Sequence, residues 1–173
     1  MYDKNINIED VISGMKRFLS VRERCKNEIN QYLRKKGYDS ETIFSVLAAL
    51  SEENLIDDRR FAKNRIYSRM HKGYGPFYIK SELNSLKISH QIINNLLEEI
   101  SEEEFLEGAF FIIDRKLPSL MAEEKSEDKL YRILKTKGFT DSLCRRALEL
   151  AKEKYPHWAH AKTVSTVHYA DEF

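Results

Sequence analysis

The sequence predicts an all-α protein, an elongated and curved array of three tandem three-helix, helix–turn–helix-like repeats of which the last is incomplete or divergent. Two observations indicate this fold. The 173 residues include only 6 Gly and 3 Pro, so helix breakers are few. The chain also aligns with itself, because segments 29–50, 79–100 and 130–151 share one pattern of apolar and polar positions.

Each of these segments is typical of a helix, a tight turn and a second helix. The start of the second helix carries a residue whose short side-chain oxygen can accept a helix-terminal amide, namely Asp39, Ser89 and Thr140. Apolar residues then recur every three or four positions, as in Ile43, Val46 and Leu50. Such units pack mainly against their neighbours, so a row of them suits binding along an extended partner.

The turn inside each unit needs a backbone conformation that glycine adopts most easily. Gly37 and Gly138 stand where the first helix of a unit must end in a left-handed residue. Lys87 takes that place in the middle unit. We therefore expect the middle turn to differ in detail.

Further helices are expected at about residues 8–19, 58–71 and 101–117. Ser20 with Glu23, and Ser101 with Glu104, fit the capping-box pattern, and Pro76 suits a first helical position. The resulting division is an N-terminal helix at 1–19, repeats at 20–72, 73–118 and 119–155, and a C-terminal tail at 156–173 whose structure stays open. Hinges are expected near residues 73–75 and 118–124.

The composition predicts a protein without membrane association, but it does not indicate a binding partner. The formal net charge is only +1, and no apolar run approaches the roughly 20 residues that span a bilayer, so we expect no membrane association. Cys25 and Cys144 stand far apart, which favours buried thiols in a reducing compartment. We expect a cytoplasmic monomer.

The adjacent carboxylates of Asp57 and Asp58 raise the question of an acid/base or metal site. Neighbouring residues on a helix point about 100° apart, so the two groups converge poorly on one ion. At a helix start, Asp58 can instead cap backbone amides while Asp57 meets the positive end of the helix dipole. We interpret the pair as structural, together with Phe61, Ala62, Gly73 and Gly75.

Other motifs of catalysis or cofactor binding are weak. His157 and His160 lie three residues apart, but no further ligand follows at a suitable spacing. G-Y-G-P at residues 73–76 has no strand before it, which argues against a nucleotide loop. We predict no catalytic residue, no metal site and no cofactor.

The distribution of charge is more informative than its sum. Between residues 59 and 87 the basic side chains are opposed only by Glu82, whereas residues 98–107 are acidic. A solvated helix face is the simplest explanation for such runs. However, Arg65, Arg69 and Lys72 share one side of a helix without acidic neighbours at four residues' distance, and tyrosines interleave with them. This pattern favours a surface that meets an external partner.

Several stretches together resemble the RecX family of recombination regulators. They are F-L-S-V-R-E-R-C at 18–25, K-K-G-Y at 35–38, L-I-D-D-R-R-F-A at 55–62, G-Y-G-P-F-Y-I-K-S-E-L at 73–83 and K-G-F at 137–139. The similarity runs from about residue 18 to 152, and its specificity comes from the combination of motifs at these distances. This sequence departs from the family pattern at Lys87, where glycine is usual, and in the tail after Tyr155.

The resemblance implies an all-helical modulator of the RecA recombinase in DNA repair, recombination and the SOS response. Such proteins lie in the groove of the RecA filament on DNA and limit its ATP hydrolysis, strand exchange and co-protease activities. DNA would then be met as part of the filament. The residues we expect to bind the filament are Arg22, Arg24, Arg59, Arg60, Lys63, Arg65, Tyr67, Arg69, Lys72, Tyr74, Lys80 and Lys87.

Two alternatives stay open at this stage. The chain could be a stand-alone helical DNA-binding protein that contacts phosphates through its basic stripe. It could also be an enzyme in which Asp57, Asp58 and nearby acids use a divalent ion.

Overall fold

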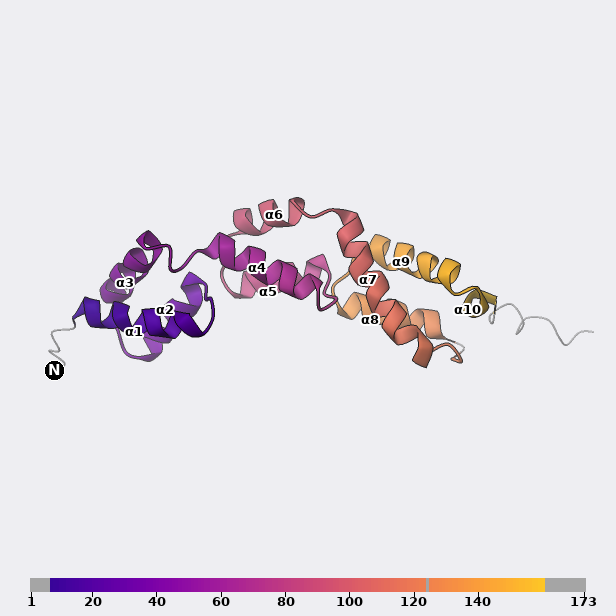
Figure 1. Cartoon of the computed structure of the whole chain (residues 1–173), viewed down its shortest axis with the longest axis horizontal. Helices are drawn as coiled ribbons and strands as arrows, with labels where there is room; N and C mark the ends of the chain where they lie inside the picture. The colour runs from indigo at the N-terminus through magenta and orange to yellow at the C-terminus, as the bar shows by residue number, and fades with distance from the viewer. Residues whose placement is uncertain (1–6, 124, 161–173) are drawn as a thin grey trace, which may run out of the picture. The chain divides into compact units, whose positions relative to one another are not determined.

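The computed structural model describes residues 7–123 and 125–160, and every regular element among them is helical (Figure 1). No helix in this part of the chain combines the length and the apolar character of a membrane span. The helices are α1 (Ile8–Val21), α2 (Lys26–Lys35), α3 (Ser40–Glu52), α4 (Asp58–Met70), α5 (Pro76–Ser85), α6 (His90–Glu98), α7 (Glu102–Lys116), the 3₁₀ turn η1 (Leu117–Ser119), α8 (Ser126–Thr136), α9 (Asp141–Lys154) and α10 (Pro156–His160).

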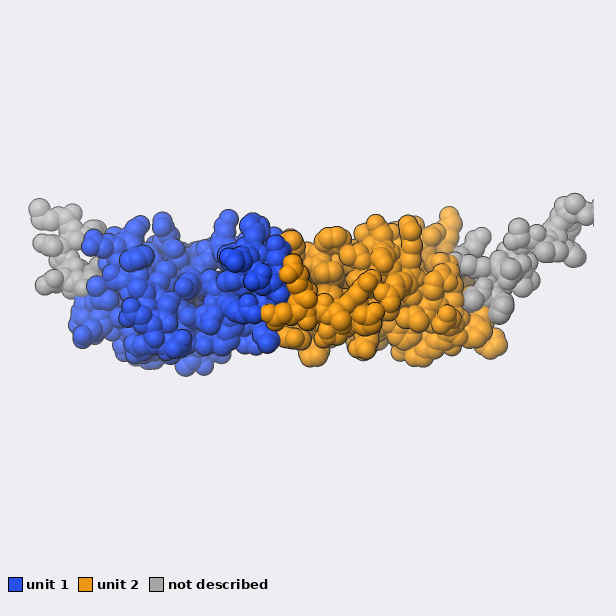
Figure 2. All heavy atoms as spheres, turned by 90° about the horizontal axis from the view of Figure 1, so that it is seen from above, with its two compact units in different colours: residues 1–65, 82–96 blue, residues 66–81, 97–173 orange. Residues whose placement is uncertain are grey.

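The chain divides into two compact units, coloured separately in Figure 2. The first contains Met1–Arg65 and Glu82–Leu96, and the second contains Ile66–Ser81 and Leu97–Phe173. The division therefore passes through α4, α5 and α6.

The core of the first unit is built by α1, α2 and α3. Val11 and Met15 from α1 are buried in one cluster with residues of the following two helices, chiefly Ile29, Leu33, Ile43, Val46 and Leu50. The aromatic rings of Phe18 and Tyr32 stack across this cluster with centroids 4.3 Å apart. The helix expected at 8–19 thus exists, and it packs as an integral member of the first helical group.

The second unit is organised around α7, α8 and α9, which pack against one another. Trp158 on α10 is only 4% exposed, and its indole Nε1–H donates to the buried Ser126 hydroxyl at 2.8 Å. The start of the expected tail at 156–173 therefore belongs to this core. The remainder of that tail, from residue 161, lies outside the described residues.

Most of the expected helix starts are confirmed. Asp39, Ser89 and Thr140 accept the amides of Thr42, Ile92 and Leu143 at 2.8, 3.3 and 3.2 Å, respectively. Ser101 and Glu104 form the expected capping box, and Pro76 opens α5. The box expected at Ser20 and Glu23 is wrong, because α1 runs on to Val21 and the Ser20 hydroxyl donates to the Arg17 carbonyl.

The three turns inside the helix–turn–helix units have one geometry, and the expected difference at Lys87 is wrong. Gly37, Lys87 and Gly138 have φ values of 87°, 61° and 85°. In each turn the following amide, that of Tyr38, Ile88 or Phe139, donates at 3.2 Å to the carbonyl five residues back. The apolar residue after the turn is half-buried or buried in every copy. Tertiary burial of that residue therefore holds even a lysine in the left-handed conformation.

We expect Lys87→Gly to stabilise the protein, because a non-glycine residue at positive φ costs about 1 kcal/mol. The Lys87 side chain is exposed, so little packing is lost. Thermal unfolding should show a rise in Tm of a few degrees. Gly37→Lys is the matched control and should lower Tm by a similar amount; a lower Tm for Lys87→Gly would contradict this account.

A surface cluster ties α7 to the end of α9. The Asp114 carboxylate accepts from Lys154 Nζ at 2.7 Å and from the Tyr155 hydroxyl at 2.5 Å. The hydrogen bond from Lys154, followed by that from Tyr155, holds the pKa of Asp114 below its usual value. A carboxylate whose pKa is lowered by folding stabilises the folded state only while it is ionised.

We therefore expect Asp114 to add stability that is present above about pH 4, the pKa range of an unfolded Asp, and that is lost as the pH falls towards the lower folded pKa. In urea unfolding from pH 6 down to pH 3, Asp114→Asn should lose less stability than the wild type. Asp128→Asn, an exposed change of the same charge, serves as the control. Equal losses in all three proteins would refute the assignment.

Candidate functional site

Asp57 and Asp58 both accept amides at helix starts, but their roles differ from those expected. Asp58 was expected to cap the helix that follows it, and Asp57 does so instead. The Asp57 carboxylate accepts the amides of Arg59 at 2.8 Å and Arg60 at 3.1 Å, so Asp57 caps its own helix, α4. The Asp58 carboxylate instead accepts the Lys26 amide at 2.8 Å, at the first residue of α2. The pair thus supplies acceptors to the starts of two helices that are far apart in sequence.

Two ion pairs lie close to these helix starts in the sequence, one formed by Arg60 and the other by Arg22. Arg60 Nε lies 2.6 Å from Glu23 Oε1, and the Asn64 amide donates to the other oxygen of Glu23 at 2.9 Å. Arg22 pairs with Glu28 at 2.6 Å, and Glu28 in turn accepts the Cys25 amide. Arg22 and Arg60, both expected to meet a partner, are therefore engaged inside the first unit.

Arg24 is also drawn into the protein. Its guanidinium carbon lies 3.7 Å from the centroid of the Phe18 ring, and its Nε is buried without a hydrogen-bond partner among the described residues. Desolvation is the main reason why the pKa of Arg24 is lowered from its usual value. On the other side of Phe18 lies Tyr32, whose ring carries Lys36 Nζ at 5.6 Å. Two cations thus close the ends of an aromatic stack.

The sequence pattern suggested that Arg65 has no acidic partner, but the structure shows that it has one. Its Nε lies 3.8 Å from Glu82 Oε1 on α5, and its guanidinium lies over the Phe61 ring. Ala62 and Ile66 of the same helix are buried. Glu82, the only acid between residues 59 and 87, therefore pairs with the first residue of the predicted stripe.

Several of the cations expected to bind a partner are exposed between residues 59 and 87. Lys63 on α4, Lys72 just after it and Lys87 after α5 are exposed, and so is Arg59 at the start of α4. Lys80 is half-buried, and the Tyr67 ring is 40% exposed. Their contact with a partner stays a prediction.

Tyr74 and Tyr78 stack with ring centroids 4.1 Å apart at the start of α5. Lys137 Nζ lies 4.1 Å from the Tyr74 ring centroid, and the Arg69 guanidinium lies 5.7 Å from it. Each ring thus contacts a cation or another ring. This group joins the end of α4 to the turn after α8, a contact that the sequence pattern did not reveal.

The expected hinge at 73–75 is closely packed in the second unit. The Gly75 amide donates to the Lys137 carbonyl at 2.8 Å, and a Cβ on Gly75 would lie 2.5 Å from the Gly138 carbonyl oxygen. Gly73 has φ 72° and a Cβ there would meet Ile112 at 2.4 Å. Both glycines are required by close approach of other atoms, which agrees with the structural part proposed for them.

The acidic stretch at the start of α7 is partly neutralised by α9. Arg146 pairs with Glu102 at 3.1 Å and with Glu103 at 3.5 Å, while Glu104 caps its own helix. Among residues 7–123 and 125–160, His, Cys, Asp and Glu side chains nowhere gather in groups of three that could hold a metal ion.

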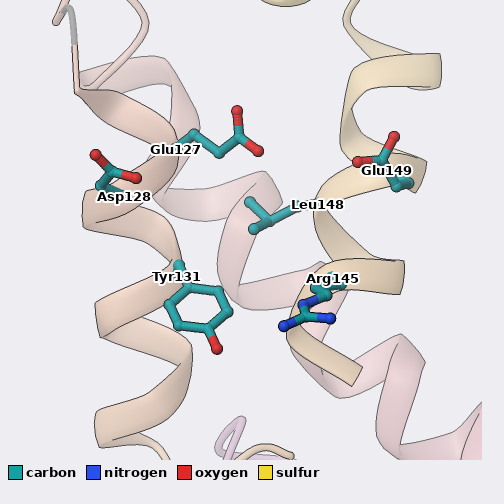
Figure 3. A pocket seen from close by; sticks show the side chains of 6 residues that line it. All are labelled: Glu127, Asp128, Tyr131, Arg145, Leu148 and Glu149. Carbon is teal, nitrogen blue, oxygen red and sulfur yellow. The ribbon is translucent and has the colours of Figure 1, made fainter. Parts of the chain in front are cut away.

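A hollow of about 410 Å³ lies between α8 and α9. In Figure 3 the Tyr131 and Arg145 side chains lie on opposite sides of it, with Leu148 behind them. Two of its acids, Glu127 and Glu149, are already paired with Lys152 at 3.0 and 2.9 Å. The hydroxyl of Tyr131 donates to Asp141 at 2.6 Å. Half of its charged side chains, and its tyrosine hydroxyl, are therefore engaged within the chain.

Two family models match the chain. They are described as the first three-helix domain of RecX, at residues 16–50, and the second three-helix domain of RecX, at residues 57–97. A regulatory protein RecX of Halorhodospira halophila is 32% identical over 146 residues, which cover 84% of this chain and 90% of that protein. The chain belongs to the RecX family. The resemblance found in the sequence is thereby confirmed, as is the all-α fold with tandem three-helix domains.

Other RecX proteins are similar in sequence or in fold. A regulatory protein RecX of Haemophilus influenzae is 33% identical over 124 residues, or 70% of this chain and 81% of that protein. The crystal structure of RecX from Lactobacillus salivarius superimposes with a TM-score of 0.74 over 82% of this chain and 94% of that chain. Its sequence identity is 20%, so this likeness shows the fold alone.

The matched ranges group the helices of this RecX-family chain in a definite way. Residues 16–50 contain the end of α1 with α2 and α3, and residues 57–97 contain α4, α5 and most of α6. Each matched domain thus joins a helix–turn–helix to the helix before it. The packing of α1 on α3, and of α7 on α8 and α9, follows the same order.

We expect Asp57→Ala and Asp58→Ala to destabilise different helices, each by about 1 kcal/mol, because each removes one helix-start acceptor. Amide hydrogen exchange should accelerate at Arg59 and Arg60 in the Asp57 variant, but at Lys26 in the Asp58 variant. Each variant is the control for the other. If both accelerated the same amides, the assignment of Asp58 to α2 would be wrong.

Proposed function

We propose that this protein binds the RecA–DNA nucleoprotein filament and inhibits the recombinase, ATPase and co-protease activities of RecA. In this proposal it acts in the cytoplasm during DNA repair, recombination and the SOS response, and it acts by binding rather than by catalysis. The observation that carries the proposal is membership of a family whose relatives are regulatory proteins. The exposed cations Arg59, Lys63, Lys72 and Lys87 support it, because a filament on DNA presents phosphates.

Inhibition by binding requires that the protein prefers one state of the filament. A ligand shifts an equilibrium only by the difference between its affinities for the two states. A rigid arrangement of helices suits this task, since it fits one filament geometry better than another. The Asp57–Asp58 junction and the Gly75–Gly138 contact supply local rigidity within the two units.

Direct binding to DNA is the second candidate, and the aromatic and cationic group around Tyr74 favours it. Stacked rings beside cations are found where proteins hold single-stranded nucleic acid. A salt titration on naked DNA separates the two functions. The second candidate requires tight and steeply salt-dependent binding without RecA, whereas the first requires tight binding only when RecA coats the DNA.

We expect reversal of Arg65, Arg69 and Lys72 to Glu to weaken inhibition of the DNA-dependent ATPase of RecA by at least about tenfold, or 1.4 kcal/mol. The remaining inhibition should fall further with added salt. Because Arg65 pairs with Glu82, thermal unfolding must show that the variant folds.

Two controls make this result specific. The swap Arg65→Glu with Glu82→Arg keeps both net charge and the ion pair, so a loss of inhibition there would implicate the position of the cation. Reversal of Lys116, Arg132 and Arg145, exposed residues of α7, α8 and α9, should change inhibition much less. If the basic variant folds and inhibits at the wild-type concentration, these three residues form only a solvated surface.

A further inference from the structure

A groove of about 400 Å³ lies in the second unit between the end of α4 and the first half of α7. Tyr67 and Met70 line it from α4, and Glu107 and Phe111 line it from α7. The Tyr67 and Phe111 rings are 40% and 46% exposed, although large aromatic side chains usually bury more of their surface. Of the residues that line it, Tyr67 alone is also among those expected to bind the RecA filament.

Gly108 lies in the interior of α7 and contributes to the groove. It has no positive φ, and a Cβ placed on it would meet only Met70 O and Phe139 Cζ, each at the ordinary contact distance of 3.9 Å. Neither backbone conformation nor close packing therefore requires glycine here, although glycine weakens a helix interior. Alanine would fit at this position, whereas a longer side chain would extend into the groove that Gly108 lines.

The charged residues that line the groove indicate the charge of the ligand it can bind. Glu104 and Glu107 line it, and Tyr67 and His71 are its other titratable groups. Two carboxylates repel the phosphates of nucleic acid but attract a cation. The exposed aromatic faces are suited to the same cation, as the Arg115 guanidinium 5.5 Å from the Phe111 ring centroid illustrates. Met70 and the aromatic rings also offer apolar contact.

We propose that this groove binds a segment of a protein partner in which an arginine or lysine stands next to an apolar side chain. The cation lies against Phe111 or Tyr67 and near Glu107, and the apolar neighbour packs over Gly108 and Met70. The protein then has two faces of opposite preference, since the cations of α4 and α5 suit phosphates or acidic surface. This second contact does not depend on RecA being the partner.

The direct test titrates two blocked peptides, acetyl-Gly-Arg-Leu-Gly-amide and acetyl-Gly-Glu-Leu-Gly-amide, into the isotope-labelled full chain. We expect the arginine peptide to cause saturable NMR shifts at Tyr67, His71, Gly108 and Phe111, with weak affinity because the ligand is small. The glutamate peptide should leave these signals unchanged. Equal responses to both peptides would overturn the proposal.

Variants of the groove make the test specific. Gly108→Gln fills the space and should weaken the arginine peptide at least about tenfold. Gly108→Ala is the matched control: it should keep binding within about threefold and raise Tm, because alanine favours the helix. Glu107→Lys should exchange the preference, so that the glutamate peptide binds more tightly.

Three outcomes would refute the proposal, because they would place the peptide at another site or identify another occupant of the groove. Wild-type binding by a folded Gly108→Gln variant would place the peptide outside the groove. Self-association in sedimentation, lost in Gly108→Gln, would identify a second copy of this chain as the occupant. Shifts of the same signals by a DNA oligonucleotide would identify a nucleic-acid surface.

Discussion

Five helix ends depend on a single backbone device, a residue in the left-handed conformation two or three positions beyond the last helical residue. Gly37, Asn54, Gly73, Lys87 and Gly138 all have positive φ, and they follow α2, α3, α4, α5 and α8. At each site the next amide returns to a carbonyl five residues back, which satisfies a carbonyl that the helix end leaves open. The chain then leaves in a direction that allows the following helix to pack on the preceding one. Without this device the short helices could not bury their apolar faces against one another.

Charged residues serve the interior contacts of each unit as much as the surface. Arg60 with Glu23 and Arg146 with Glu102 join segments far apart in sequence, and Arg22 with Glu28 joins the end of α1 to α2. Exposed pairs of this kind contribute little stability singly, but they fix orientation when they share a helix start with a cap. The chain therefore has two groups of charged side chains despite its near-zero net charge. One group is engaged in contacts within the units, and the other faces solvent at the surface. The second group reaches phosphate, an acidic surface or a cationic peptide without first breaking an internal contact.

The candidate site was predictable from sequence to the extent that it depended on local rules. Capping by Asp39 and Ser101, the glycine positions and the run of cations on α4 all follow from patterns within a few residues. The partners of Asp58, Arg65 and Gly75 could not be found in this way, because Lys26, Glu82 and Gly138 approach them from other helices. The exchange of tasks between Asp57 and Asp58 had the same cause: both residues can cap a helix, and the neighbouring α2 decided which one did.

By itself, the sequence determined the helical class, the helix–turn–helix units, most helix starts and the family. The helical features depend on propensity, periodicity and capping, which act over less than about ten residues, whereas the family is indicated by a combination of motifs spread along the chain. The tertiary structure decided that Lys87 adopts a glycine conformation, that Trp158 is buried on Ser126 and that a groove remains open at Gly108. It also decided which cations are engaged by acids. Each of these outcomes depends on atoms brought together from distant parts of the chain, and the free energy of that packing exceeds the local preference of the residue concerned.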